Sequence, residues 1–177
     1  MYSERRVEAV QEVKAVGAGS AGVQAIRAVT TQPRSDSRQE RVSTAVVYCE
    51  ANFGGVDGKT ANGLVRHSEE YEILSVIDSR QAGLDAGLTL GEGLMGIPIC
   101  SSLADALAHY GGVPDYYILG MAPASGMLST RERDLVLEAI SLGMSVVNGL
   151  HEFLNDDPEF VAACAATGVH ILDVRKP

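Results

Sequence analysis

A glycine-rich segment after the first apolar run of the chain has the composition of a phosphate-binding turn. Three glycines, a cation and a hydroxyl stand there together, namely Gly54, Gly55, Gly58, Lys59 and Thr60. Glycines let a backbone turn tightly and approach a ligand, and the free amides at a helix start favour an anion. The spacing is not that of a P-loop, because Phe53 stands where that motif requires its first glycine. We expect phosphate or acyl-carrier binding here; the alternative is a turn that only tightens packing and leaves Lys59 in solvent.

Asp78 ends the second apolar run, SVID. An acid at the end of the second strand of a nucleotide-binding fold can accept hydrogen bonds from both ribose hydroxyls. The same side chain could instead cap the turn that follows it. Both interpretations stay open on the sequence.

The segment GMAPASGM supplies a third group of candidates, Pro123, Ser125 and Gly126. Its backbone amides and its hydroxyl could line a ligand. Neither a neighbouring histidine nor a GxSxG elbow marks Ser125 as a nucleophile, so we expect ligand contacts rather than covalent chemistry.

The segment NGLHE offers an amide, an imidazole and a carboxylate in Asn148, His151 and Glu152. A histidine and an acid just past a strand could act as proton donor and orienting partner, or could bind a ligand carboxylate. A loop histidine can also simply hydrogen-bond backbone carbonyls. We take His151 and Glu152 as the candidate catalytic residues and Asn148 as a ligand-binding residue.

Two other kinds of site are not favoured by the sequence. Residues 17–22 read GAGSAG, a literal GxGxxG, but no solid strand precedes them and no βαβ unit surrounds them, so a flexible hinge is the better interpretation. The four histidines and three cysteines include no pair with metal-ligand or CxxC spacing, so we expect neither a metal centre nor a disulfide framework.

The elements that must position these residues alternate between short apolar runs and helical patterns, which is typical of βαβ units and a parallel sheet. Strands are predicted at residues 44–49, 72–77, 97–100, 116–119, 145–147 and 170–174. Helices are predicted at residues 59–67, 84–90, 103–110, 131–142 and 159–167. The simplest arrangement is a Rossmann-like, doubly wound α/β sheet with strand order 3-2-1-4-5-6, which places the candidates at the carboxyl edge where such folds bind ligands.

Charge divides the chain into two parts. Residues 1–41 carry seven Lys/Arg against five Asp/Glu, whereas residues 42–177 carry seven against eighteen, within a total of -9. We therefore expect a Rossmann-like domain at 42–177 and an N-terminal extension at 1–41, with an amphipathic helix at 4–16 and a polar linker at 30–41. The acidic balance argues against nucleic-acid and anionic-membrane partners. The free cysteines and the absence of a long apolar run favour a soluble protein of the reducing cytoplasm.

Five segments together resemble one known family: VVYCEANFGGVDGKTANGLVRHSEEYEILSVIDS, GIPICSSLADAL, ILGMAPASG, VVNGLHEFLNDDPEF and ILDVRKP. This is the D-glutamate N-acetyltransferase-like family, long catalogued as a domain of unknown function. Its members have a Rossmann-like N-terminal domain followed by a P-loop-like C-terminal domain. The resemblance runs from Thr44 to Pro177 and includes no counterpart of the second domain.

The resemblance implies a domain that binds a nucleotide, CoA or an amino-acid carboxylate, with acetyl-CoA or a nucleotide as the cofactor. It also implies amine attack on an acetyl thioester, with His151 as the nearest candidate base, and a requirement for a P-loop-like partner domain or subunit in a homo- or hetero-oligomer. Two alternatives remain: a non-catalytic assembly module that docks through its N-terminal arm, and an NAD(P)-binding oxidoreductase-type domain, for which fold analogy is the only support.

Overall fold

The computed structural model describes residues 41–123 and 125–177. Its strands form one six-stranded sheet in the order β3-β2-β1-β4-β5-β6, and every neighbouring pair is parallel. The strands are β1 (Ser43–Tyr48), β2 (Tyr71–Ile77), β3 (Ile99–Cys100), β4 (Tyr116–Leu119), β5 (Ser145–Asn148) and β6 (Ile171–Asp173). The predicted fold class and strand order are confirmed, and strand order reverses between β1 and β4.

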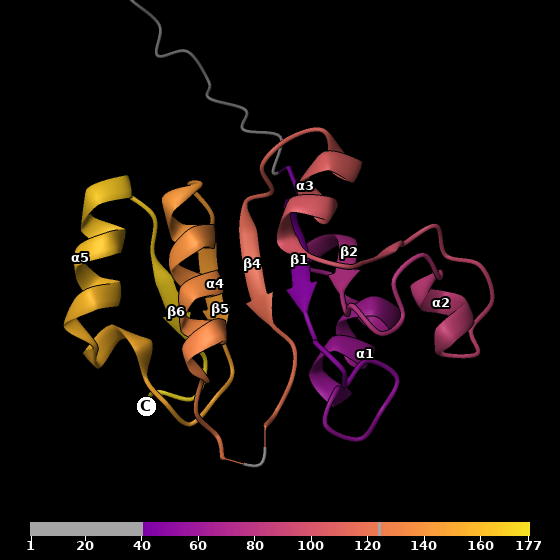
Figure 1. Cartoon of the computed structure of the whole chain (residues 1–177), viewed down its shortest axis with the longest axis horizontal. Helices are drawn as coiled ribbons and strands as arrows, with labels where there is room; N and C mark the ends of the chain where they lie inside the picture. The colour runs from indigo at the N-terminus through magenta and orange to yellow at the C-terminus, as the bar shows by residue number, and fades with distance from the viewer. Residues whose placement is uncertain (1–40, 124) are drawn as a thin grey trace, which may run out of the picture. The chain divides into compact units, whose positions relative to one another are not determined.

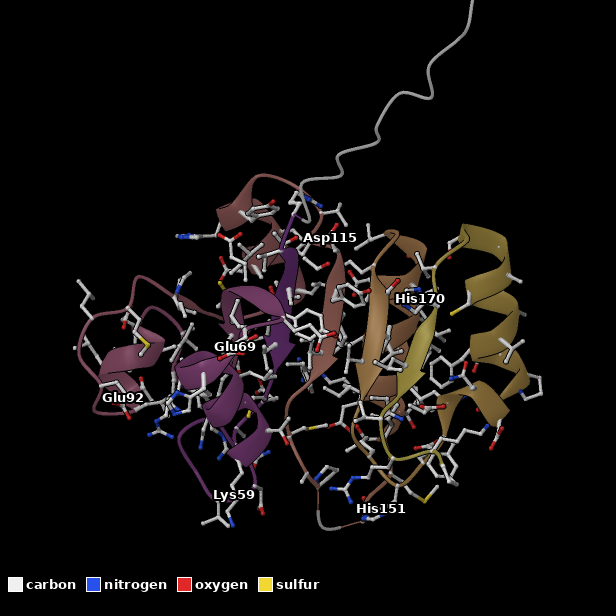
Figure 2. All side chains as sticks on the ribbon, turned by 180° about the vertical axis from the view of Figure 1, so that it is seen from behind. Lys59, Glu69, Glu92, Asp115, His151 and His170 are labelled. Atoms are coloured by element: carbon white, nitrogen blue, oxygen red, sulfur yellow. The ribbon has the colours of Figure 1, made fainter. Side chains whose placement is uncertain are left out.

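Helices cover the two faces of the sheet unequally. They are α1 (Lys59–His67), α2 (Ala86–Thr89), α3 (Leu103–Tyr110), α4 (Thr130–Ser141) and α5 (Pro158–Thr167), with a short 3-10 turn η1 (Leu154–Asp156). Right-handed crossovers place α1 and α2 on one face and the later helices on the other. Figure 1 shows α3 and α4 on the side facing the viewer, and Figure 2, from behind, shows α1 in front of β1.

The predicted and observed bounds differ most around β3 and α2. The strand is only two residues long, and the helix covers four of the seven residues expected. Asp85 explains the difference, because its carboxylate accepts hydrogen bonds from the amides of Leu88, Met95 and Gly96 and folds this segment into a loop around itself. Local side-chain acceptors of this kind compete with regular structure.

The start of α1 is held against the sheet by a close backbone approach. A Cβ at Gly120 would lie 2.5 Å from Cγ1 of Val47 and 2.8 Å from Cβ of Ala61, so only glycine fits after β4. The Ala61 amide donates to the Gly120 carbonyl at 3.0 Å. This contact fixes the first turn of α1 beside the end of β4, which is where a ligand site of this fold is expected.

The predicted extension lies almost wholly outside the described residues, as do the 4–16 helix and the 17–22 glycine motif. Of residues 1–41 only Arg41 is described, and its guanidinium forms an ion pair with Asp115 at 2.8 Å. In the described part of the chain, no helix has both the length and the apolar character that a bilayer span requires.

Candidate functional site

The predicted site residues gather at the carboxyl edge of the sheet. Figure 2 shows Lys59, at the start of α1, and His151, after β5, at the same edge. The glycine turn and the β4 loop also adjoin each other, because the Ala122 amide donates to the Asp57 carbonyl at 2.8 Å. Chain topology thus brings together segments that are far apart in the sequence.

Two amides of the glycine turn already have acceptors within the chain. The Gly54 backbone amide donates to Oδ1 of the Asn62 side chain at 3.0 Å, and Nδ2 of the same side chain donates to the Gly55 carbonyl at 3.1 Å. The Gly55 amide donates to the Asn52 carbonyl at 2.9 Å. Asn62 is buried and clamps the turn. In this conformation Gly54 and Gly55 shape the loop, and their role as an anion cradle stays a prediction.

The amides from Val56 to Thr60 have no acceptor among the described residues, and Gly58, Lys59 and Thr60 form the end of this run at the start of α1. Gly58 itself is enclosed, because a Cβ there would lie 2.3 Å from the Asn52 carbonyl oxygen. Lys59 and Thr60 are exposed at the first turn of α1. These residues present a cation, a hydroxyl and the positive end of the helix dipole to the carboxyl edge.

Asp78 is fully buried and accepts three hydrogen bonds. Its carboxylate receives the amides of Phe53 at 3.2 Å and Arg80 at 3.0 Å, and Nε2 of Gln81 at 3.4 Å. These contacts tie the glycine turn to the end of β2, in keeping with the capping interpretation. A ribose hydroxyl could reach this carboxylate only by displacing one of these donors, so the hydroxyl-acceptor role stays a prediction.

The β4 loop places small residues around the imidazole of His151. Gly126 has a left-handed backbone, with φ +69°, and a Cβ there would lie 3.3 Å from the His151 ring. The His151 amide also donates to the Gly126 carbonyl at 3.3 Å. Ser125 is occupied locally, because its hydroxyl donates to the Met127 carbonyl at 3.1 Å and accepts the Met127 amide at 3.3 Å.

Asn148 lies in a buried polar network rather than on a ligand-facing surface. It is 0% exposed; its side-chain amide donates to Oδ1 of Asp173 at 2.8 Å and to the Glu152 carbonyl at 2.7 Å. Asp173 also receives the amides of Leu154 and Asn155 and the Asn155 side chain. Burial opposes ionisation of Asp173, but these hydrogen bonds outweigh it and lower the pKa of the carboxyl. Sequence reasoning quoted Asp173 within ILDVRKP without assigning it a role, and this network is what joins that segment to NGLHEFL.

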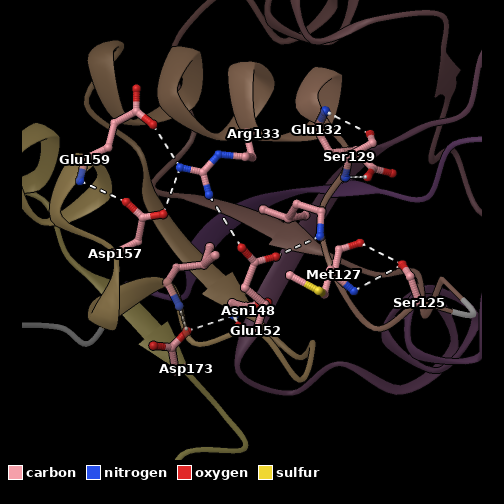
Figure 3. Close-up of polar contacts among 12 residues, drawn as sticks. Ser125, Met127, Ser129, Glu132, Arg133, Asn148, Glu152, Asp157, Glu159 and Asp173 are labelled. Atoms are coloured by element: carbon pink, nitrogen blue, oxygen red, sulfur yellow. Dashed lines mark hydrogen bonds and ion pairs between the residues drawn. The ribbon is translucent and has the colours of Figure 1, made fainter.

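Glu152 fastens the β4 loop to α4 (Figure 3). Its carboxylate accepts the Leu128 amide at 2.8 Å and lies 3.5 Å from the Arg133 guanidinium. Arg133 in turn pairs with Asp157 and Glu159 at the start of α5. The described contacts of the Glu152 carboxylate are therefore structural. No contact between this carboxylate and the His151 imidazole supports the predicted catalytic role, which stays a prediction.

The partner of His151 is Arg175, which sequence reasoning did not single out. Nη1 of Arg175 lies 3.1 Å from Nε2 of His151. A guanidinium carries only donors, so Nε2 accepts and the proton of the neutral ring lies on Nδ1. The two side chains border a cavity of about 200 Å³ whose remaining walls come from the β4 and β5 loops, including Pro123, Ser125 and Gly149. This cavity is the candidate site.

Two further chemical features lie elsewhere. On the sheet face that α3 and α4 cover, the rings of Tyr48 and Tyr117 stack with their centroids 6.0 Å apart beside a cavity of about 30 Å³. The buried Tyr117 hydroxyl has no hydrogen-bond partner among the described residues. Across residues 41–123 and 125–177, no group of three or more His, Cys, Asp or Glu side chains is placed to hold a metal ion.

Comparison with known proteins assigns the second half of the chain to a family. The model of a domain of unknown function, the DUF1611_N Rossmann-like domain, matches residues 79–177, which is more than half of the sequence. The chain belongs to the DUF1611_N family. The matched range contains Ser125, His151 and Arg175 but begins after the glycine turn. The family resemblance inferred from the motifs is thus confirmed.

The chain is also similar to longer proteins. The crystal structure of a DUF1611 family protein from Anabaena variabilis is 32% identical, with a TM-score of 0.67, and the match covers 76% of this chain and 37% of that one. A D-glutamate N-acetyltransferase from Pseudoalteromonas sp is 32% identical over 91 residues, covering 51% of this chain and 25% of the enzyme. A second, from Tritonibacter scottomollicae, is 33% identical over 60 residues, covering 34% of this chain and 18% of that enzyme. This DUF1611_N chain therefore spans about a quarter or less of the two acetyltransferase sequences.

Proposed function

We propose that the cavity beside Arg175 and His151 binds the anionic group of a small molecule. The group would be a phosphate of a nucleotide or of CoA, or an amino-acid carboxylate. Lys59 and Thr60, at the start of α1, would contribute from the neighbouring strand end. Such a site would combine the positive end of α1 with a guanidinium, which is suited to bidentate binding of a carboxylate or a phosphate.

The observation that carries this proposal is that the Arg175 guanidinium borders the cavity and contacts the His151 imidazole rather than a carboxylate. Four other described cations, Arg41, Arg66, Arg133 and Lys176, form ion pairs with carboxylates. Arg175, like Lys59, Arg80 and Arg131, has no carboxylate partner among the described residues. Of these four described cations, Arg175 is the one that borders the candidate cavity. A cation held by a neutral imidazole at the rim of a cavity is available to an incoming anion.

The related acetyltransferases suggest what the ligand does. Acetyl-CoA brings phosphates and D-glutamate brings carboxylates, and transfer requires a base to take a proton from the attacking amine. In the described state Nε2 of His151 is occupied by Arg175. If an anion draws Arg175 away, Nε2 is freed to accept a proton, so ligand binding and base activation would be coupled. Because the chain spans only part of its relatives, we expect acetyl transfer only together with a P-loop-like partner domain or subunit.

Isothermal titration calorimetry with acetyl-CoA, NAD, D-glutamate and inorganic phosphate tests the binding claim. We expect at least one of them to bind. Removing one charge-assisted contact costs about 1.5–3 kcal/mol, so Arg175→Ala should weaken binding by about 10- to 100-fold and Lys59→Ala should also weaken it. If none of the four ligands shows binding, the proposal is wrong.

Arg66→Ala is the matched control. Arg66 lies near the end of α1 opposite Lys59 and pairs with Glu92 at 2.6 Å. Its removal should leave the affinity within about twofold, since surface charges beyond about 10 Å are screened at moderate salt. An equal loss in Arg66→Ala and Arg175→Ala would mean that only net charge matters.

The assembly alternative concerns residues 4–16, which lie outside the described part of the chain. Deleting residues 1–41 separates it from the ligand site. Loss of self-association or of a partner with ligand binding intact would favour assembly, whereas unchanged association together with a binding defect in Lys59→Ala would favour the cavity.

A further inference from the structure

A second, larger cavity lies on the sheet face that α1 covers only in part. It has a volume of about 380 Å³, and its floor is formed by Ile118, Val147 and Leu172 of β4, β5 and β6. Leu64 of α1 forms one wall. Figure 2 shows β5 and β6 on this side with none of the described helices in front of them. Parallel sheets normally bury both faces, so this apolar groove is unusually open.

The groove and the candidate anion site share part of their lining. Gly149 and Arg175 border both cavities, so the groove begins where the proposed anion site ends. Thr60 also lies at this end of the groove. The other end is marked by Glu70 and Tyr71, at the start of β2. One end is therefore cationic, the floor is apolar and the far end carries a carboxylate.

We infer that the ligand of this domain is an amphipathic anion with an extended apolar body, of the class of medium-chain carboxylates. This inference rests on the proposed anion site. The anionic head would contact Arg175, and the apolar body would lie along Val147 and Leu172. Glu70 sets the orientation, because a head group at that end would meet a like charge.

The volume of the groove sets the size of the apolar body. A methylene group is close in size to a water molecule, which occupies about 30 Å³, so the groove accommodates about twelve carbons. Leu172 is 47% exposed and Val174 is 60% exposed, and a chain lying on them would remove apolar surface from water. Full burial of a methylene is equivalent to about fourfold in affinity, and a groove open on one side should give about twofold.

Titration with acetate, hexanoate and decanoate tests the inference on the whole chain. Decanoate should bind about 16-fold more tightly than hexanoate, at about twofold for each of its four additional methylenes. Leu172→Gln, which removes the apolar contact without adding a charge, should abolish this dependence on chain length while leaving acetate and phosphate binding within twofold. Val174→Gln is the second variant, and circular dichroism checks that each variant is folded.

Leu88→Gln is the control, because Leu88 is a similarly exposed leucine, at 59%, on α2 and away from the groove. It should bind all three carboxylates like the unmodified chain. If short anions bind but decanoate gains nothing over hexanoate, or if Leu88→Gln acts like Leu172→Gln, the inference is overturned and the anion site stands. If none of the anions binds, both fail. A dimer in sedimentation that Leu172→Gln dissociates and Leu88→Gln does not, with no carboxylate response, also overturns it.

Discussion

The Asp173 network gives the sharpest stability prediction. Oδ1 of this buried carboxylate accepts the Asn148 side chain at 2.8 Å and the Leu154 amide at 3.1 Å, and Oδ2 accepts the amide and the side chain of Asn155 at 3.0 and 2.9 Å. Asp173→Asn replaces one oxygen with an NH₂ group that cannot accept. The two hydrogen-bond donors that the lost oxygen accepted would then face the NH₂ group, which is itself a donor.

The loss of stability in Asp173→Asn depends on which pair of donors, the one on Oδ1 or the one on Oδ2, loses its acceptor. Asn155 is exposed, so the new NH₂ group should turn toward it, where water and a flip of the Asn155 amide can compensate in part. One buried donor left unpaired costs about 1–3 kcal/mol, and loss of the charge weakens the remaining bonds. We expect Asp173→Asn to lower the free energy of unfolding by about 2–3 kcal/mol at pH 7, which is about 1–2 M in the urea midpoint.

The effect should depend on pH with a definite sign. Because the folded-state pKa of Asp173 is lowered, its contribution is fully present above the unfolded value of about 3.9 and is lost as the pH falls through the folded value. The difference between the unmodified chain and Asp173→Asn should therefore shrink below about pH 4. The control is Asp156→Asn, since Asp156 is an exposed acid that pairs with Lys176. That change should cost less than about 1 kcal/mol. Equal urea midpoints for the two variants at pH 7 would refute the reasoning.

Three further measurements follow from single side chains. Gly58→Ala should lower the free energy of unfolding by about 1–3 kcal/mol, because its Cβ would lie 2.3 Å from a backbone oxygen, whereas Gly63→Ala, with no atom within 4 Å, should be neutral or stabilising; similar urea midpoints for both would contradict the close contact. Tyr117→Phe should leave the unfolding free energy unchanged or raise it by up to about 1 kcal/mol, since the hydroxyl has no partner among the described residues, and a clear loss would reveal one. Burial, reinforced by Asp78, raises the pKa of Cys49 to about 12, so Cys49 should resist a thiol reagent at pH 8 until urea unfolds the protein, while the partly exposed Cys164 reacts first.

Much of the architecture could be predicted from the sequence because it is encoded locally. Apolar runs of strand length alternate with amphipathic segments, and capping residues mark the helix ends. Asp157 accepts the Glu159 amide at the start of α5, and Gly168 ends that helix with a left-handed backbone. These signals act over a few residues, so they located α1 and α3 at their observed bounds and fixed the strand order through the crossover rule. The helix predicted at residues 84–90 is shorter in the structure because Asp85 is satisfied by amides up to eleven residues away.

What each candidate side chain does was decided only by the tertiary structure. The sequence identified Asn148, Asp78 and Glu152 as polar groups at strand ends, but it could not show that other segments already satisfy them, since their partners come from Asp173, Phe53 and Leu128. The same folding brings Arg175 from the last segment onto His151 and leaves its charge without a carboxylate among the described residues. Composition and periodicity determine that polar loops meet at one edge of a parallel sheet. Which of their groups are already bonded, and which remain free for a ligand, depends on distances between segments that no local pattern carries.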